Sequence, residues 1–357
     1  MAAKTPGVPG HTSYRGRKAV QLESDTLRLT VLVEGGHLAE LLHKPSGVNP
    51  LWTPPWPSIE PSAYDPAKHP EYGQGADGLL LCGIMGHSLC LDIFGGPSEE
   101  EAAAGMTAHG EASAAGYDVG VQNGVLTQRA TFPEAGLHFE RTISFESSTL
   151  LRITEEVENL TAWDRPVGWT QHVSLGDPFV EPGVTEFRAS AARSKVFEGD
   201  FAGGQGYMEI GAEFDWPHVP RSGGGTVDMR TFVDLPVSGA YSAHLMDPRR
   251  QDAFFLAWNP KLKVLLGYVW KRSDFPWLGI WEENRSRTHA PWNGRTIARG
   301  MEFGVSPMPE TRRAMIERGS LFGVPGFRWV PAKRKVRAEY RTFLIASDSI
   351  SAKPPVG

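Results

Sequence analysis

Short runs in which polar and apolar residues alternate recur along most of this chain. Between Thr26 and Val33 the two kinds of side chain largely alternate, and after Gly35-Gly36 a second run covers His37 to His43. A period of two residues predicts half-buried β-strands, and the glycine pair predicts a turn that joins them as a hairpin.

The same pattern continues to the end of the chain. Val119 to Arg129, Leu137 to Phe145 and Leu150 to Val157 predict consecutive strands of a meander, with turns at Asn123-Gly124 and at short Pro, Glu and Ser segments. Further strands are predicted over Ala253–Trp258, Lys263–Trp270, Gly279–Glu282, Met301–Val305 and Lys335–Ile345.

Helical signals are few. The segment Glu310 to Arg318 follows Pro309 and predicts a helix, and Ser98 to Ala104 predicts a shorter one that Gly105 ends. The chain is therefore predicted to be all-β with few short helices. No repeat or linker divides its 357 residues, so we expect one domain with a core from about residue 25 to 345 and flexible termini.

Two long irregular segments interrupt the strands. Residues 50–78 are rich in Pro, Tyr and Trp, and residues 199–226 are rich in Gly. Because long loops in a compact domain are usually functional or disordered, we expect the first to wall a pocket and the second to be a mobile excursion.

Composition agrees with many turns between short strands. The chain has 40 Gly and 28 Pro, which are scattered rather than periodic. Its 11 Trp are numerous, and aromatic faces suit sugar rings, although most Trp side chains serve core packing.

Charge and cysteine content exclude several classes of protein. The net charge is −5 and no basic block is present, so nucleic acid is not an expected partner. Cys82 and Cys90 are too few for a disulfide framework and indicate a reducing compartment. The sequence shows neither a signal peptide nor an apolar run of membrane-spanning length, so we expect a cytoplasmic protein without membrane association.

Three side chains are the strongest candidates for chemistry. His109 and His172 each stand next to a glycine-containing turn at the end of a strand-like run, and Glu302 lies among small and apolar residues. Imidazole transfers protons near neutral pH, and an apolar setting raises a carboxyl pKa toward that of a general base. Each histidine also has a structural interpretation, as a turn or buried residue bonded to the backbone.

These residues stand in motifs that resemble the galactose mutarotase-like (aldose 1-epimerase) superfamily. The motifs are Ala108-His109-Gly110, then Glu158-Asn159-Leu160-Thr161 leading to Gln171-His172, then Gly300-Met301-Glu302. The resemblance covers residues 25–345 and implies an antiparallel β supersandwich. It also implies an enzyme that interconverts the anomers of an aldose or aldose derivative without cofactor or metal.

The resemblance assigns roles to these positions. Glu302 would take the proton of the anomeric hydroxyl, His172 would protonate the ring oxygen, and His109 would donate a hydrogen bond to the ring oxygen or a neighbouring hydroxyl. The family often has an Arg before the His-Gly step, whereas this chain has no Arg from residue 72 to 108. Substrate binding is therefore expected to differ.

Further substrate contacts are predicted at four positions. Asp247 is placed as the family's substrate-binding aspartate, and Trp277 and Trp281 as aromatic faces that stack on the sugar. His87 is expected either to be structural or to line the same cavity. Glu282 and Glu283 are expected to form an exposed acidic edge. No metal-binding spacing of His or Cys is present.

Two other functions remain open at this point. A carbohydrate-binding protein without turnover would keep the cleft and its aromatic walls. A glycoside hydrolase or lyase on the same fold would need paired carboxylates about 5 to 9.5 Å apart. The sequence leaves the sugar, its anomer, any phosphate or acid group on it and the oligomeric state open.

Overall fold

The computed structural model describes residues 10–73 and 75–355 of the chain. Antiparallel β-sheet dominates this part, as the alternating pattern predicted. The predicted flexible termini fall in part on residues 1–9 and 356–357, which lie outside the described residues, as does the segment tested for a signal peptide. The single domain stays a prediction.

Twelve strands form the larger sheet. Their order is β1 (His11–Tyr14), β2 (Arg17–Glu23), β3 (Leu27–Leu32), β4 (Leu38–His43), β5 (His87–Asp92), β10 (Arg165–Gly176), β20 (Ile297–Gly304), β19 (Trp277–Asn284), β16 (Ser238–Met246), β12 (Ala191–Val196) and β13 (Glu213–Asp215), with β23 (Arg328–Val330) paired to β10.

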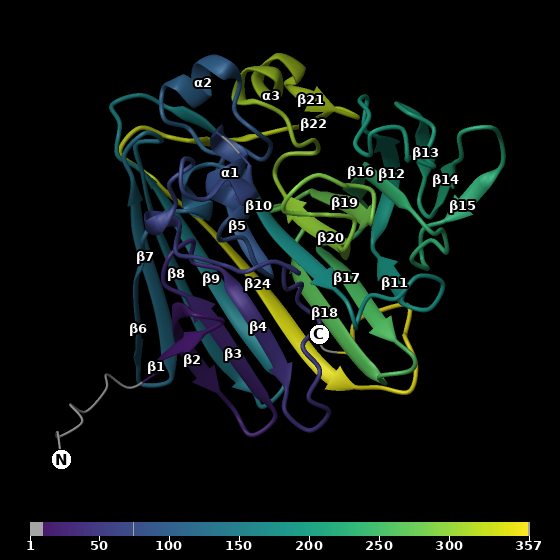
Figure 1. Cartoon of the computed structure of the whole chain (residues 1–357), viewed down its shortest axis with the longest axis horizontal. Helices are drawn as coiled ribbons and strands as arrows, with labels where there is room; N and C mark the ends of the chain where they lie inside the picture. The colour runs from purple at the N-terminus through teal and green to yellow at the C-terminus, as the bar shows by residue number, and fades with distance from the viewer. Residues whose placement is uncertain (1–9, 74, 356–357) are drawn as a thin grey trace.

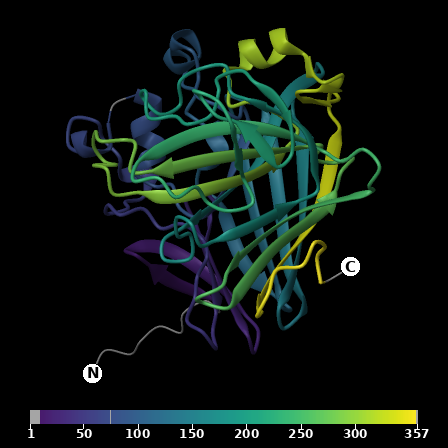
Figure 2. The ribbon, with the colours of Figure 1, turned by 90° about the vertical axis from the view of Figure 1, so that its right-hand side faces the viewer.

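Eight strands form the second sheet, which lies against the first (Figures 1 and 2). Their order is β11 (Glu186–Ala189), β17 (Asp252–Asn259), β18 (Val264–Lys271), β24 (Lys335–Ala346), β9 (Leu150–Asn159), β8 (Leu137–Ser147), β7 (Val125–Phe132) and β6 (Asp118–Gln122). Two small hairpins pair β14 (His218–Pro220) with β15 (Thr226–Asp228) and β21 (Ser320–Leu321) with β22 (Val324–Pro325).

The helices gather at one end of the sheets, at the top of Figure 1. They are α1 (Gly75–Leu81), α2 (Glu99–Ala103) and α3 (Arg312–Arg318), with 3₁₀ turns at Pro61–Ala63, Pro70–Tyr72 and Glu111–Ser113. Both predicted helices are confirmed: Ser98 and Glu101 form a capping box at α2, and Thr311 caps α3. Helix α1 lacks a capping or periodic signal, and the sequence did not predict it.

A buried polar network links the two sheets beneath β10. The Arg141 Nε donates to Glu155 Oε1 at 2.7 Å, and both side chains are almost fully buried. Trp169 Nε1, Gln171 Nε2 and the Tyr340 hydroxyl also donate to the Glu155 carboxylate. This network fixes which face of β10 looks toward the second sheet.

No helix in the described residues is both long and apolar enough to cross a membrane. Cys82 and Cys90 are buried free thiols. The cytoplasmic location stays a prediction.

Candidate active site

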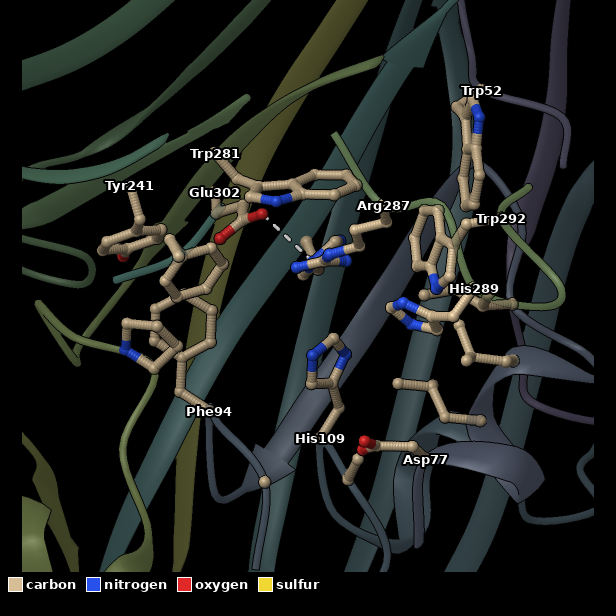
Figure 3. A pocket seen from close by; sticks show the side chains of 18 residues that line it. Trp52, Asp77, Phe94, His109, Tyr241, Trp281, Arg287, His289, Trp292 and Glu302 are labelled. Atoms are coloured by element: carbon tan, nitrogen blue, oxygen red, sulfur yellow. Dashed lines mark ion pairs between the residues drawn. The ribbon is translucent and has the colours of Figure 1, made fainter. Parts of the chain in front are cut away.

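A cavity of about 370 Å³ opens on the face of the larger sheet that points away from the second sheet. Successive side chains of a strand point to opposite faces. On β10, Gln171 bonds into the network between the sheets, so its neighbour His172 points the other way, into the cavity. Glu302 on β20 reaches the same cavity (Figure 3).

His172 and Glu302, hereafter the proton pair, stand directly opposite each other on paired strands. His172 Nε2 lies 3.0 Å from Glu302 Oε1 (dashed line in Figure 3), although Oε1 is out of line for a hydrogen bond. The other ring nitrogen, Nδ1, is 3.1 Å from Ser174 Oγ. Gly300 makes room for the carboxyl group, because a Cβ there would lie 2.2 Å from Glu302 Oε1.

Burial sets the protonation of this pair. The exposed fraction is 2% for Glu302 and 7% for His172. Desolvation raises the pKa of Glu302 to about 8, against the lowering effect of the Arg287 charge. Desolvation also lowers the pKa of His172 to about 4. At neutral pH the pair is therefore a carboxylic acid beside a neutral imidazole.

His109 completes the set predicted from the motifs. Its ring centroid lies 4.8 Å from that of His172, and its Nδ1 is buried without a hydrogen-bond partner. Burial, with the nearby His172, holds the pKa of His109 well below its usual value. The following Gly110 is required by packing, since its φ is 76° and a Cβ would lie 2.1 Å from the Leu91 carbonyl oxygen.

Aromatic rings form much of the cavity wall. Trp52 and Trp292 stack with centroids 6.0 Å apart, and Trp281 meets Trp292 edge to face at 6.1 Å. Phe201 packs on Tyr241 at 5.5 Å. Trp52 and Asp77 come from residues 50–78, in agreement with the expectation that this segment walls a pocket. Phe201 comes from residues 199–226, whose mobility stays a prediction.

Arg287 was not predicted from the sequence. This residue lies in the loop after β19 and lines the cavity, with its guanidinium 4.6 Å from the Trp292 ring and 5.4 Å from that of Trp281. Its neighbours in sequence, Ser286 and Thr288, form no motif. The sequence feature that could have pointed to Arg287 is its place in the aromatic segment from Trp277 to Trp292. Arg287 brings an arginine to this cavity from a segment other than residues 72–108.

Of the four further predicted contacts, only Trp281 lines this cavity. His87 points between the sheets, where its Nε2 is 3.0 Å from Gln171 Oε1 and its Nδ1 is 3.2 Å from the Tyr268 hydroxyl. His87 therefore lies on the face of β5 that is opposite the cavity. These contacts make His87 a core residue.

Trp277 and Asp247 also lie outside the cavity lining. The Trp277 ring is fully buried, and its Nε1 donates to the Pro325 carbonyl. The Asp247 carboxylate forms ion pairs with Arg249 and Arg250 in the turn after β16. Local ion pairing and core packing therefore account for these two side chains.

The expected acidic edge at Glu282 and Glu283 is wrong, because both residues are 1% exposed. The Tyr207 hydroxyl donates to Glu282 at 2.7 Å. The Glu283 carboxylate accepts hydrogen bonds from the Ser286 backbone and hydroxyl. Strand β19 lies inside the larger sheet and is covered on both faces, which alternation alone did not indicate.

The part of the chain that the structure describes contains no group of three or more His, Cys, Asp or Glu side chains placed to hold a metal ion. The cavity thus presents a proton pair, a second imidazole, a guanidinium and aromatic walls. This set can hold a polyhydroxylated ring and move protons on it.

The chain is similar to known proteins in fold, but its sequence matches no family model and no curated protein sequence. Solved structures do match. A protein from Klebsiella pneumoniae, provisionally assigned as an aldose 1-epimerase, is 13% identical with a TM-score of 0.65, over 94% of this chain and 82% of that one.

Two further structures agree. A galactose mutarotase-like protein from Clostridium acetobutylicum is 15% identical, with a TM-score of 0.59 over 94% of this chain and 98% of that one. A galactose mutarotase related enzyme from Lactobacillus acidophilus is 12% identical, with a TM-score of 0.59 over 93% and 99%. The chain therefore has the galactose mutarotase-like fold that its motifs predicted.

Proposed function

We propose that this chain is an enzyme that interconverts the anomers of an aldose or aldose derivative by general acid-base catalysis. The observation that carries the proposal is the proton pair, whose nitrogen and oxygen are 3.0 Å apart in an aromatic-walled cavity. The fold shared with mutarotase-like proteins adds support.

The proton pair holds the one exchangeable proton that the reaction needs. In the free site this proton resides on Glu302. Its transfer to His172 yields a carboxylate base and an imidazolium acid together. The hydroxyls of a bound sugar favour this charged arrangement, because they replace part of the solvation that burial removed.

Each step then conserves protons. Glu302 takes the proton of the anomeric hydroxyl while His172 gives its proton to the ring oxygen, and the bond between the anomeric carbon and the ring oxygen breaks. The open-chain aldehyde rotates about its first carbon-carbon bond. Closure on the other face returns the proton from Glu302 to the anomeric oxygen and the proton of the chain hydroxyl to His172.

His109 and the aromatic walls would position the ring. His109 lines the same cavity as the proton pair, and its imidazole can hydrogen-bond to the ring oxygen or a neighbouring hydroxyl. The Trp281 ring centroid is 6.2 Å from that of His172, so a sugar that stacks on Trp281 lies next to the acid.

The test is the rate of anomer interconversion, followed by polarimetry or exchange NMR with a panel of aldoses and uronic acids and corrected for the spontaneous reaction. Glu302→Gln and His172→Gln are each expected to lower the enzymatic rate about 10²- to 10⁴-fold. Glu317→Gln, at a side chain 64% exposed, is the matched control.

Equal rates for wild type and Glu302→Gln would reject the proposal. Sugar binding without any acceleration would favour a carbohydrate-binding protein. Release of reducing ends from an oligosaccharide would favour a hydrolase, although Glu302 faces an imidazole rather than a second carboxylate.

A further inference from the structure

Arg287 presents an unused hydrogen-bonding fork to the cavity. Its Nε is 3.6 Å from Glu283 Oε2, too far for a hydrogen bond, and no described residue accepts a hydrogen bond from either terminal nitrogen. Figure 3 shows the side chain reaching toward Glu302 and His109 between the rings of Trp281 and Trp292.

The aromatic rings hold this fork in place. The guanidinium carbon lies 4.6 Å from the Trp292 ring centroid and 5.4 Å from that of Trp281, so cation–π contacts with both rings restrict the movement of the group. A guanidinium held in this way loses little side-chain entropy when it forms two parallel hydrogen bonds. The geometry is suited to a planar acceptor with two oxygens.

The charges around Arg287 favour an anion there. Among the described residues that line the cavity, Arg287 is the single Lys or Arg, and Asp77 is exposed to solvent, which screens its charge. Glu302 is mostly protonated at neutral pH because burial raises its pKa to about 8. The Glu283 carboxylate forms an ion pair with Arg287 Nε at 3.6 Å and also accepts hydrogen bonds from Ser286. This pair engages the Nε side of the guanidinium, and the terminal nitrogens keep their hydrogen-bonding capacity for a ligand in the cavity.

We propose that the cavity is selective for an aldose that carries a carboxylate, a uronic acid, and that Arg287 Nη1 and Nη2 bind this carboxylate in a bidentate pair. Such pairs match the two oxygens of a carboxylate to the two nitrogens of one fork. A phosphate ester carries about two negative charges at neutral pH, and one arginine balances only one of them. The inference rests on the proposed sugar-binding function of this cavity and deepens it.

The experiment is calorimetric titration of the full chain at pH 7 with D-glucuronate, D-glucose and D-glucose 6-phosphate. Wild type is expected to bind glucuronate about 10- to 100-fold more tightly than glucose, the range for hydrogen bonds to charged groups. In Arg287→Gln this ratio is expected to fall to about 1, while Arg287→Lys, which keeps the charge without the fork, gives an intermediate ratio.

Arg249→Gln is the matched control, since it removes the same charge from a side chain 86% exposed and outside the cavity lining. It is expected to keep the wild-type ratio. Circular dichroism checks that each variant is folded, and Arg287→Lys serves as the decisive variant where Arg287→Gln does not fold.

Three results would overturn the inference. They are equal affinities of wild type for glucuronate and glucose, a ratio that stays unchanged in the Arg287 variants, and tighter binding of glucose 6-phosphate than of glucuronate. Anomer interconversion measured on the same samples separates this inference from the proposed function. Rapid interconversion with no effect of Arg287 on selectivity would reject the uronic-acid inference and leave the proposed enzyme activity standing. Arg287-dependent binding without interconversion would reject the enzyme activity and leave the inference standing.

Discussion

Substitution of Glu302 by glutamine is expected to remove a pH dependence of stability that the buried carboxyl imposes on the native protein. The native pKa is about 8, whereas the ordinary value is 4.5. Between these values the native state holds a proton that the unfolded chain has released, so the free energy of unfolding falls by about 1.4 kcal/mol per pH unit. The contribution of the Glu302 proton to the free energy of unfolding is complete below pH 4.5 and is lost as pH rises through 8.

The buried histidines change stability in the opposite direction. Burial lowers the pKa of His172 to about 4 from 6.5, so the unfolded chain binds more protons in this interval and stability rises with pH. His37, His87, His109 and His244 are shifted the same way. Each of these histidines is only half titrated in the unfolded chain at the ordinary value of 6.5, so together they oppose the effect of Glu302 just above that pH. The variant Glu302→Gln keeps all of these histidines, so its difference from wild type isolates the contribution of Glu302.

Between pH 6.5 and pH 8 Glu302 is expected to cost the wild type about 2 kcal/mol of unfolding free energy. Urea unfolding at pH 6.5 and at pH 8 measures it in wild type, Glu302→Gln and the exposed control Glu317→Gln. Glutamine keeps the shape of the side chain and does not titrate. The stability of Glu302→Gln should therefore rise by about 2 kcal/mol relative to wild type between the two pH values. The same pH dependence in wild type and Glu302→Gln would refute the assignment of a raised pKa.

Three further predictions follow from the same geometry. The interconversion rate, measured by exchange NMR, should be level between about pH 4 and 8. Above pH 8 it should fall about tenfold per pH unit, because the proton pair loses its one proton. A rate that still rises at pH 9 would contradict this. Glu155→Ala should lower the unfolding free energy by about 3 to 5 kcal/mol in urea, because it leaves Arg141 charged and unpaired in the core. Gly110→Ala should cost about 1 to 3 kcal/mol and slow the reaction, since its Cβ would collide with the Leu91 carbonyl and shift His109; a wild-type melting temperature would count against this.

Several features of the fold were readable from the sequence because their causes are local. Alternation over residues 26–33 and 37–43 specified strands β3 and β4, and Asn123-Gly124 marked the turn between β6 and β7. The prolines and glycine around residues 98–104 and 310–318 marked helices α2 and α3, and the structure adds their caps at Ser98 and Thr311. Strand β16 was missed, since all nine of its residues are buried and it shows no alternation.

The candidate site was partly readable for a related reason. His109, His172 and Glu302 stand in short motifs, so their position along the chain was enough to select them. Asp247 was selected in the same way, yet the neighbouring Arg249 and Arg250 occupy its carboxylate. A motif identifies a residue type at a position, and it does not report which group that side chain contacts.

The sequence by itself determined the all-β class, many of the strand positions and the three residues of the motif set, because these depend on periodicity and on neighbours a few positions away. Only the tertiary structure decided that His172 stands opposite Glu302, that Arg287 enters their cavity, and that His87 faces the other side. Strand register and burial arise from contacts between segments far apart in the chain. The protonation of Glu302 follows from that burial, so it too became visible only in three dimensions.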